Sequence, residues 1–345
     1  MNTENKTAVR KNKKTNATVA IFYITKNGHK LAGRVAGLFP DAEILKFNTA
    51  VFTERWTAAR KIVCIMATGI AVRTMSSLLE DKKTDPAVVL LDEKGSFVIS
   101  LLSGHIGGAN KLAKDIADGI GAVPVITTAS DVQGKVALDM WAEAMGLYVE
   151  NFELLKKMSA RIVNGKKVRV KVEGLSKKIK LPSGLVRAGT VREADIIISP
   201  KLYKKKALYF RPKVLCAGIG CNRGTTKKEI GEVLGSMFKS AGLSLNSIST
   251  LASIDLKKDE KGLVGFARDN GLGIEFFDKD ELNLTVEKHD IRSSAVVKTA
   301  TGAAAVAEPA ALLSAKRISG EFSVIIPKEK RGNVTLAIAL AELSL

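Results

Sequence analysis

From Ala17 onward, short runs rich in β-branched residues alternate with runs whose apolar residues recur at helical spacing. Residues 19–25 predict a strand and residues 28–39 predict a helix. Two further strand-like runs at 87–91 and 96–102 are joined by an Asp-Glu-Lys-Gly turn, which predicts a hairpin. The alternation as a whole predicts an α/β fold with mostly parallel sheets.

The pattern divides the chain into four segments. We expect a basic tail at 1–16, an N-terminal α/β domain at 17–134, a small basic middle module at 135–212 and a C-terminal α/β domain at 213–345. The middle module is predicted to have low helical content from residue 156 onward. Further strands are expected at 44–47, 61–67, 123–127, 167–172, 194–199, 214–217, 248–254, 273–277 and 322–326. Further helices are expected at 70–80, 112–120, 136–146, 227–241, 258–270 and 303–315.

The net charge of +19 is concentrated in the middle of the chain. Residues 156–213 carry 18 basic and 3 acidic side chains, a net charge of +15. Basic stripes of this kind occur in nucleic-acid-binding proteins. Aromatic side chains for base stacking are sparse there (Tyr203, Tyr209 and Phe210), and no RNA- or DNA-binding motif is readable. A solvated basic face, or a funnel for a polyanionic metabolite, fits the segment equally well.

Composition argues against several classes of protein. No run approaches the roughly 18 consecutive apolar residues that a membrane span needs. Residues 1–16 lack the apolar stretch of a secretory signal. The chain has three cysteines without close spacing, an odd number that argues against a disulfide framework. We therefore expect a cytoplasmic protein in which Cys64 and Cys216 are core residues.

A first glycine-rich loop follows the predicted strand at 96–102. A strand, a glycine turn and a helix start together aim backbone N–H groups at one place, which suits a phosphate, a carboxylate or a developing oxyanion. His105 lies inside this loop and is a candidate general base, the alternative being a histidine that only orders its own turn. The candidate binding residues of the loop are Ser103, Gly104, Gly107, Gly108 and Asn110.

A second glycine-rich loop follows the predicted strand at 214–217. Its glycine spacing is one residue too long for the dinucleotide fingerprint, and no acidic residue stands where the ribose would need one. Neither loop matches the phosphate-binding GxxxxGK[ST] pattern, so a nicotinamide cofactor and nucleotide hydrolysis are both disfavoured. The arginine of this loop offers two-point carboxylate binding, and residues 226–229 have the spacing of a capping box. The candidate binding residues are Gly218, Gly220, Cys221, Arg223 and Thr225.

A third candidate anion turn consists of Lys298, Thr301 and Gly302, ahead of an alanine-rich helix. Glu308 lies inside that helix and is a second candidate catalytic residue if buried, the alternative being an ordinary exposed acid. His29 and His289 stand in polar surroundings and are predicted to be surface residues. Without a cluster of histidine, cysteine and carboxylate ligands, the sequence predicts no metal site.

Taken in order, these motifs resemble the CbiG family of cobalamin biosynthesis, the cobalt-precorrin-5A hydrolases of the anaerobic pathway. The resemblance extends over about residues 18–340, although Asn222 and Ala300 depart from the family pattern, where Arg and Gly are expected. The motifs that carry it are residues 100–110, 125–131, 218–225 and 301–311.

The resemblance implies an anionic cobalt-corrinoid substrate whose δ-lactone is opened, with release of acetaldehyde, to give cobalt-precorrin-5B. It implies no protein cofactor, because the cobalt belongs to the substrate, and it makes neighbouring enzymes of the pathway candidate partners, without nucleic acid or membrane. His105 is then the leading candidate for the base. Two alternatives stay open: a non-catalytic protein that binds and transfers corrinoid intermediates, and a basic nucleic-acid-binding protein.

Overall fold

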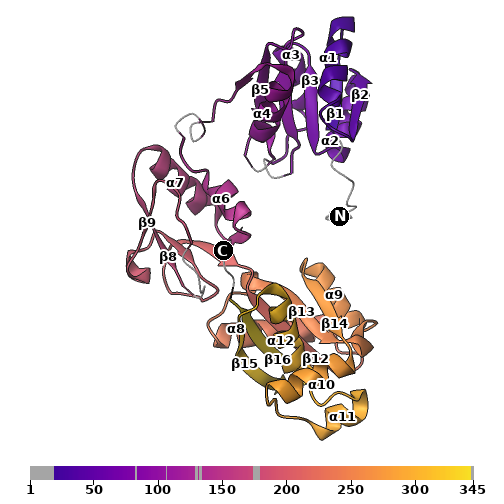
Figure 1. Cartoon of the computed structure of the whole chain (residues 1–345), viewed down its shortest axis with the longest axis vertical. Helices are drawn as coiled ribbons and strands as arrows, with labels where there is room; N and C mark the ends of the chain where they lie inside the picture. The colour runs from indigo at the N-terminus through magenta and orange to yellow at the C-terminus, as the bar shows by residue number, and fades with distance from the viewer. Residues whose placement is uncertain are drawn as a thin grey trace, which may run out of the picture. The chain divides into compact units, whose positions relative to one another are not determined.

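The computed structural model describes residues 19–81, 84–105, 107–128, 131, 134–173 and 179–342. The chain divides into two compact units, residues 1–140 and 141–345 (Figure 1). The predicted tail at 1–16 lies outside the described residues. Among the described helices, none is long and apolar enough to cross a membrane.

The strands of the N-terminal unit are β1 (Val19–Tyr23), β2 (Ala42–Lys46), β3 (Lys61–Ile65), β4 (Ala87–Leu91), β5 (Phe97–Leu102) and β6 (Val123–Val125). They form one six-stranded sheet in the order β2-β1-β3-β4-β5-β6. The first four strands of that order are mutually parallel, β5 is antiparallel to β4, and β6 is parallel to β5. The predicted hairpin and the mostly parallel sheet are therefore confirmed. Because β5 runs antiparallel to β4, the first glycine-rich loop leaves the sheet at the end where β1, β3 and β4 begin.

Four described helices that cover this sheet are α1 (Lys26–Ala36), α2 (Thr49–Ala58), α3 (Thr68–Met75) and α4 (Ala109–Ile120). Residues of α1 and α4 pack on one face, and residues of α2 and α3 pack on the other. The sequence did not predict α2, because its buried residues are only Phe52 and Trp56. The helix begins at Asn48, whose side chain accepts hydrogen bonds from the N–H groups of the first turn.

The predicted middle module contains α6 (Leu138–Ala144), α7 (Phe152–Val163), a 3-10 turn η1 (Val191–Glu193) and the strands β7 (Leu147–Val149), β8 (Val168–Val172), β9 (Leu185–Arg187), β10 (Ile196–Ile198) and β11 (Leu208–Pro212). The sheet order is β7-β11-β10-β8-β9, in which only β7 is antiparallel to its neighbour. From residue 156 onward the described module is mostly strands and loops, as predicted, and the end of α7 is the exception. Its buried residues Leu155 and Ile162 form a short stripe, which the exposed Lys156 and Lys157 masked in the sequence.

The C-terminal sheet consists of β12 (Leu215–Cys221), β13 (Ile248–Ile254), β14 (Gly273–Phe277), β15 (Phe322–Arg331) and β16 (Val334–Ala341), in the order β14-β13-β12-β16-β15. The strands β12, β13 and β14 are parallel, and β16 is antiparallel to both of its neighbours. The bounds predicted for β13 and β14 are confirmed. The described helices α8 (Lys227–Ser240) and α9 (Lys261–Asp269) pack on one face, and α10 (Lys279–Lys288) and α12 (Ala307–Ile318) pack on the other.

The second glycine-rich loop was placed wrongly by the sequence, since Gly218 and Gly220 lie inside β12. A Cβ atom added at Gly218 would lie 1.8 Å from the backbone oxygen of Ala307. Glycine is therefore required there because the first turn of α12 rests directly on the strand. The turn itself begins at Asn222, and α8 starts after Thr226.

Two predictions about helix ends need correction. Lys298 and Thr301 lie inside the short helix α11 (Ala295–Thr301), which Gly302 ends with a φ of +75°. The predicted capping box at α8 is half formed. The Thr226 hydroxyl accepts from the N–H of Glu229, but the Glu229 carboxylate accepts from the N–H of Asn333 on the sheet instead of returning to Thr226.

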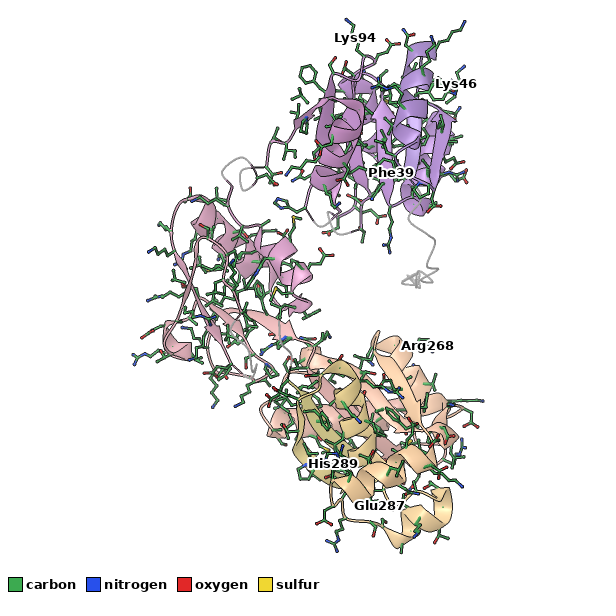
Figure 2. The ribbon with its side chains drawn as sticks, in the orientation of Figure 1. Phe39, Lys46, Lys94, Arg268, Glu287 and His289 are labelled. Carbon is green, nitrogen blue, oxygen red and sulfur yellow. The ribbon has the colours of Figure 1, made fainter. Side chains whose placement is uncertain are left out.

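All three cysteines are free thiols. Cys64 and Cys216 are fully buried, as predicted, and burial raises the pKa of each thiol to about 12. His29 and His289 are exposed, also as predicted; His289 follows the end of α10 (Figure 2). Within the described residues, no group of three or more histidine, cysteine and acidic side chains is placed to hold a metal ion.

Candidate functional site

The first glycine-rich loop joins β5 to α4 and closes on itself. The N–H groups of residues 108–110 donate to the carbonyl oxygens of residues 103–105, at 2.9 to 3.1 Å. The Ser103 hydroxyl donates to the carbonyl of Asp85 at 3.2 Å, and a Cβ atom at Gly107 would lie 2.3 Å from the Ser103 Cβ. The expectation that this helix start offers free N–H groups to an anion is therefore wrong for those three groups, which the loop uses itself.

His105 of this loop lies between two carboxylates. Its Nε2 is 2.9 Å from Asp131 Oδ2, and its Nδ1 is 3.8 Å from Asp139 Oδ2. The three side chains are mostly buried, with 19%, 24% and 15% of their surface exposed. Because an ionised carboxylate only accepts hydrogen bonds, the contact with Asp131 assigns the hydrogen to Nε2 and sets the orientation of the ring.

Asn110 fixes Asp131 from the other side. Its Nδ2 donates to the same Oδ2 atom at 2.9 Å, and its Oδ1 accepts from the hydroxyl of Ser100 at 2.6 Å. The Asn110 side chain is buried, so this network is held inside the unit. The structure thus connects two predicted site residues, His105 and Asn110, through the Asp131 carboxylate.

Sequence reasoning assigned no role to Asp131 or Asp139. The position of Asp131 in the sequence could have indicated such a role. It ends the polar stretch that follows β6, and β6 is the strand beside β5, from which the His105 loop leaves. A histidine held by a buried aspartate can take a proton, since the carboxylate orients the ring and stabilises the imidazolium that forms. This cluster is therefore able to support general base catalysis.

The turn after β12 also uses its own N–H groups. The N–H of Gly224 donates to the Glu260 carboxylate at 3.1 Å, and the N–H of Thr225 donates to the carbonyl of Asn222 at 3.3 Å. Glu260 is 5% exposed. A buried internal carboxylate therefore occupies the position at which the sequence predicted an external anion.

Arg223 is already paired. One of its Nη atoms lies 2.5 Å from Asp259 Oδ1, and the other donates to the carbonyl of Leu256 at 2.7 Å. The hydrogen bond with Asp259 raises the pKa of Arg223 and lowers that of Asp259. Because the arginine is 60% exposed, this pair is open to competition from a ligand carboxylate.

A cavity of about 540 Å³ opens at the carboxyl ends of β12 and β13. From the predicted set, Gly220, Cys221, Arg223 and Thr301 line it, whereas Gly218, Thr225, Lys298, Gly302 and Glu308 lie outside its lining. The cavity also has three basic side chains that sequence reasoning did not select: Lys257, Lys328 and Lys330.

Two of the predicted binding residues that line the cavity, Cys221 and Thr301, are uncharged. Burial raises the pKa of the Cys221 thiol, so this group is protonated at neutral pH and is a poor nucleophile. The Thr301 hydroxyl donates to the carbonyl of Val297 at 2.8 Å and accepts from the N–H of Ala303 at 3.2 Å. Both contacts of Thr301 are thus local to the end of α11.

Glu308 lies in the first turn of α12 and is half-buried. Its Oε2 accepts a hydrogen bond from the backbone N–H of Lys328 at 3.0 Å. The register of β15 against β16 shifts between Ile326 and Glu329, so this N–H belongs to an irregular part of the ladder. The carboxylate therefore holds the strand segment that borders the cavity.

Comparison with known proteins gives the family. Three family models match successive parts of the chain: Cobalamin synthesis G N-terminal at 50–131, the cobalamin biosynthesis central region at 136–212 and Cobalamin synthesis G C-terminus at 215–339. A cobalt-precorrin-5A hydrolase of Priestia megaterium is 33% identical and covers 93% of this chain and 94% of its own length. A protein of the same name from Salmonella typhimurium is 31% identical, covering 93% and 98%.

Among solved structures, a cobalamin biosynthesis protein G homologue from Sulfolobus solfataricus is similar with a TM-score of 0.38 and 22% identity, covering 94% of this chain and 98% of its own. The family assignment rests on the sequence matches, which extend over nearly the whole length of both chains. The chain therefore belongs to the CbiG family of cobalamin biosynthesis proteins.

Proposed function

We propose that this chain is a cobalt-precorrin-5A hydrolase of anaerobic cobalamin biosynthesis. The observation that carries the proposal is the match, above 30% identity over 93% of the chain, to two relatives that bear this name. The mostly buried cluster of His105, Asp131 and Asp139 supports hydrolysis, because it supplies a positioned proton acceptor.

In the proposed reaction, water attacks the carbonyl carbon of the δ-lactone and the ring C–O bond breaks. His105 takes the proton from the attacking water, while Asp131 stabilises the imidazolium. The released alkoxide then forms a carbonyl as the adjacent C–C bond breaks, and acetaldehyde leaves. The electron pair of that bond passes to the conjugated macrocycle, which gains a proton in exchange.

This sequence of steps consumes one water and needs neither an oxidant nor a protein-bound cofactor. The cobalt enters and leaves with the substrate. We propose a supporting role for Glu308, which holds the backbone of Lys328 and does not transfer a proton. The oxyanion donors are not assigned to the N–H groups of residues 108–110, because the loop already uses those groups.

The direct test is anaerobic incubation of the purified chain with cobalt-precorrin-5A and measurement of acetaldehyde. We expect catalytic release, and we expect His105→Ala to reduce turnover by about 100-fold. The exposed His289→Ala variant is the matched control and should keep wild-type turnover. Stoichiometric binding of the corrinoid by folded wild-type protein without acetaldehyde would contradict the proposal and favour the carrier alternative.

A further inference from the structure

We propose that the cavity at the carboxyl ends of β12 and β13 binds the carboxylate-bearing edge of a corrinoid ring, with Lys328 and Lys330 as its anion-binding side chains. The identity of the ring rests on the proposed function. The preference for an amphipathic polycarboxylate rests on the charges and the lining of the cavity itself.

The cavity has an excess of positive charge. Its described lining contains four basic side chains and no carboxylate. Arg223 and Lys257 each pair with an acid outside the lining, at 2.5 and 3.4 Å. Within the described part of the chain, neither Lys328 nor Lys330 has a carboxylate within ion-pair distance of its ammonium group. These two charges are therefore available to an anionic ligand.

The spacing of the two lysines favours two separate anions. They stand two positions apart on β15, and both line the cavity, so their backbone positions are about 6 to 7 Å apart. Lysine ammonium groups act as point charges, and two of them at that separation suit carboxylates on neighbouring substituents. A single phosphate would instead need converging N–H donors, and the N–H groups of Gly224 and Thr225 are already used.

Much of the remaining wall is apolar, beside polar residues such as Asn222, Ser294 and Thr335. Val296 of α11 is 79% exposed and Leu256 is 48% exposed, although both border the cavity. Ile254, Val297 and Val306 extend the same surface. A small hydrophilic anion would leave this wall in water, whereas the flat hydrocarbon face of a macrocycle would cover it. The apolar part of the wall and the two lysines, Lys328 and Lys330, together favour an amphipathic anionic ligand.

The N-terminus of α12 adds to the positive electrostatic potential of the cavity. Residues 305–307 line the cavity, and the N-cap residue Val306 has no side-chain capping bond. The helix comes this close to the sheet because Gly218 lacks a side chain. The positive end of the helix macrodipole thus lies on the same side of the sheet as the two lysines.

The test compares two stable corrinoids that share one ring, dicyanocobyrinic acid with free carboxylates and dicyanocobinamide with amides. Binding to the full-length chain is measured by equilibrium dialysis and visible absorbance at low salt. We expect the acid to bind at least about tenfold more tightly than the amide, with an affinity that falls as salt rises. The double variant Lys328→Ala, Lys330→Ala should bind the acid about tenfold more weakly.

The matched control is Lys228→Ala, Lys239→Ala, which removes two exposed charges from α8 on the other face of the same sheet. It should bind like wild type. A second probe, Val296→Asp, changes an exposed residue, so it should fold normally and yet weaken binding of the acid. Equal affinity for the two corrinoids, or wild-type affinity in the Lys328/Lys330 variant, would overturn the proposal.

Acetaldehyde release separates this proposal from the proposed function. If wild type releases acetaldehyde and the Lys328/Lys330 variant has an unchanged KM, the cavity proposal fails while the hydrolase stands. If wild type binds dicyanocobyrinic acid through the two lysines but releases no acetaldehyde, the hydrolase fails while the cavity remains a corrinoid site.

Discussion

The Glu150 carboxylate and the Arg211 guanidinium form a two-point ion pair, with Nε–Oε1 at 2.8 Å and Nη2–Oε2 at 3.0 Å. Arg211 has 2% of its side chain exposed, and its guanidinium lies 4.4 Å above the centre of the Tyr209 ring. Glu150 also accepts hydrogen bonds from Ser244 and Asn246, both at 3.0 Å. Glu150 therefore links the predicted middle module to the segment between α8 and β13, and the charge of Arg211 is unavailable to a ligand.

Replacing Arg211 should destabilise the second unit strongly. In Arg211→Met, the mostly buried Glu150 charge loses its partner, and we expect a loss of about 3 kcal/mol. Urea denaturation followed by circular dichroism measures the shift. Arg192→Ala is the control, because Arg192 is exposed and in the same segment, and it should unfold at the wild-type urea concentration. Equal midpoints for the two variants would show that the pair contributes little.

The same pair predicts a pH dependence. Burial alone would raise the pKa of Glu150, but hydrogen bonds from Arg211, Asn246 and Ser244, with the charge of Arg211, outweigh burial and hold the pKa below its ordinary value of 4.5. Since the folded-state pKa is lowered, the stabilisation is complete above the unfolded-state pKa and is lost as pH falls through the folded-state pKa.

Glu150→Gln tests this sign. The wild type should exceed the variant in free energy of unfolding at about pH 7, and the difference should shrink as the pH falls below about 4.5. Denaturant titrations across that range measure it. A difference that stays constant with pH would mean that Glu150 does not carry the pH dependence.

Gly218→Ala should disturb the contact between β12 and α12. The added methyl group would lie 1.8 Å from the carbonyl oxygen of Ala307, so the helix start must move, and we expect a loss of about 2 to 3 kcal/mol. Gly235→Ala is the matched control, because Gly235 lies in the interior of α8 with open space around its Cα. It should raise stability by about 0.5 to 1 kcal/mol. Thermal denaturation of the two variants gives opposite shifts if the packing argument holds.

Asp131→Asn should impair turnover more than binding. The amide cannot act as a full-charge acceptor for the His105 imidazolium, so we expect kcat for acetaldehyde release to fall by about 100-fold with little change in KM. Asp118→Asn, an exposed change on α4, should leave both constants unaltered. A loss of affinity at unchanged kcat would instead assign Asp131 to substrate binding.

Much of the architecture could be predicted from local patterns. The alternation of apolar runs predicted the α/β class, the hairpin of β4 and β5, and the bounds of β13 and β14, because buried strands and amphipathic helices each leave a periodic signal. The signal failed at α2 and α7, which bury few large side chains, and at β16. The alanine and leucine run of β16 has no alternation, because the strand is buried on both faces between neighbours.

The candidate site could be predicted only in part from the sequence, because its side chains come from segments that are far apart in the chain. Composition and motif order were enough to indicate the family, the absence of a nucleotide fingerprint, and His105 and Asn110 as members of one loop. Only the tertiary structure brings Asp131 to His105, places the Glu260 carboxylate against the turn after β12, and makes Gly218 a packing residue under α12. The physical reason is that a local pattern specifies which backbone groups a turn exposes, whereas the partner that satisfies each group is chosen by packing between segments far apart in the chain.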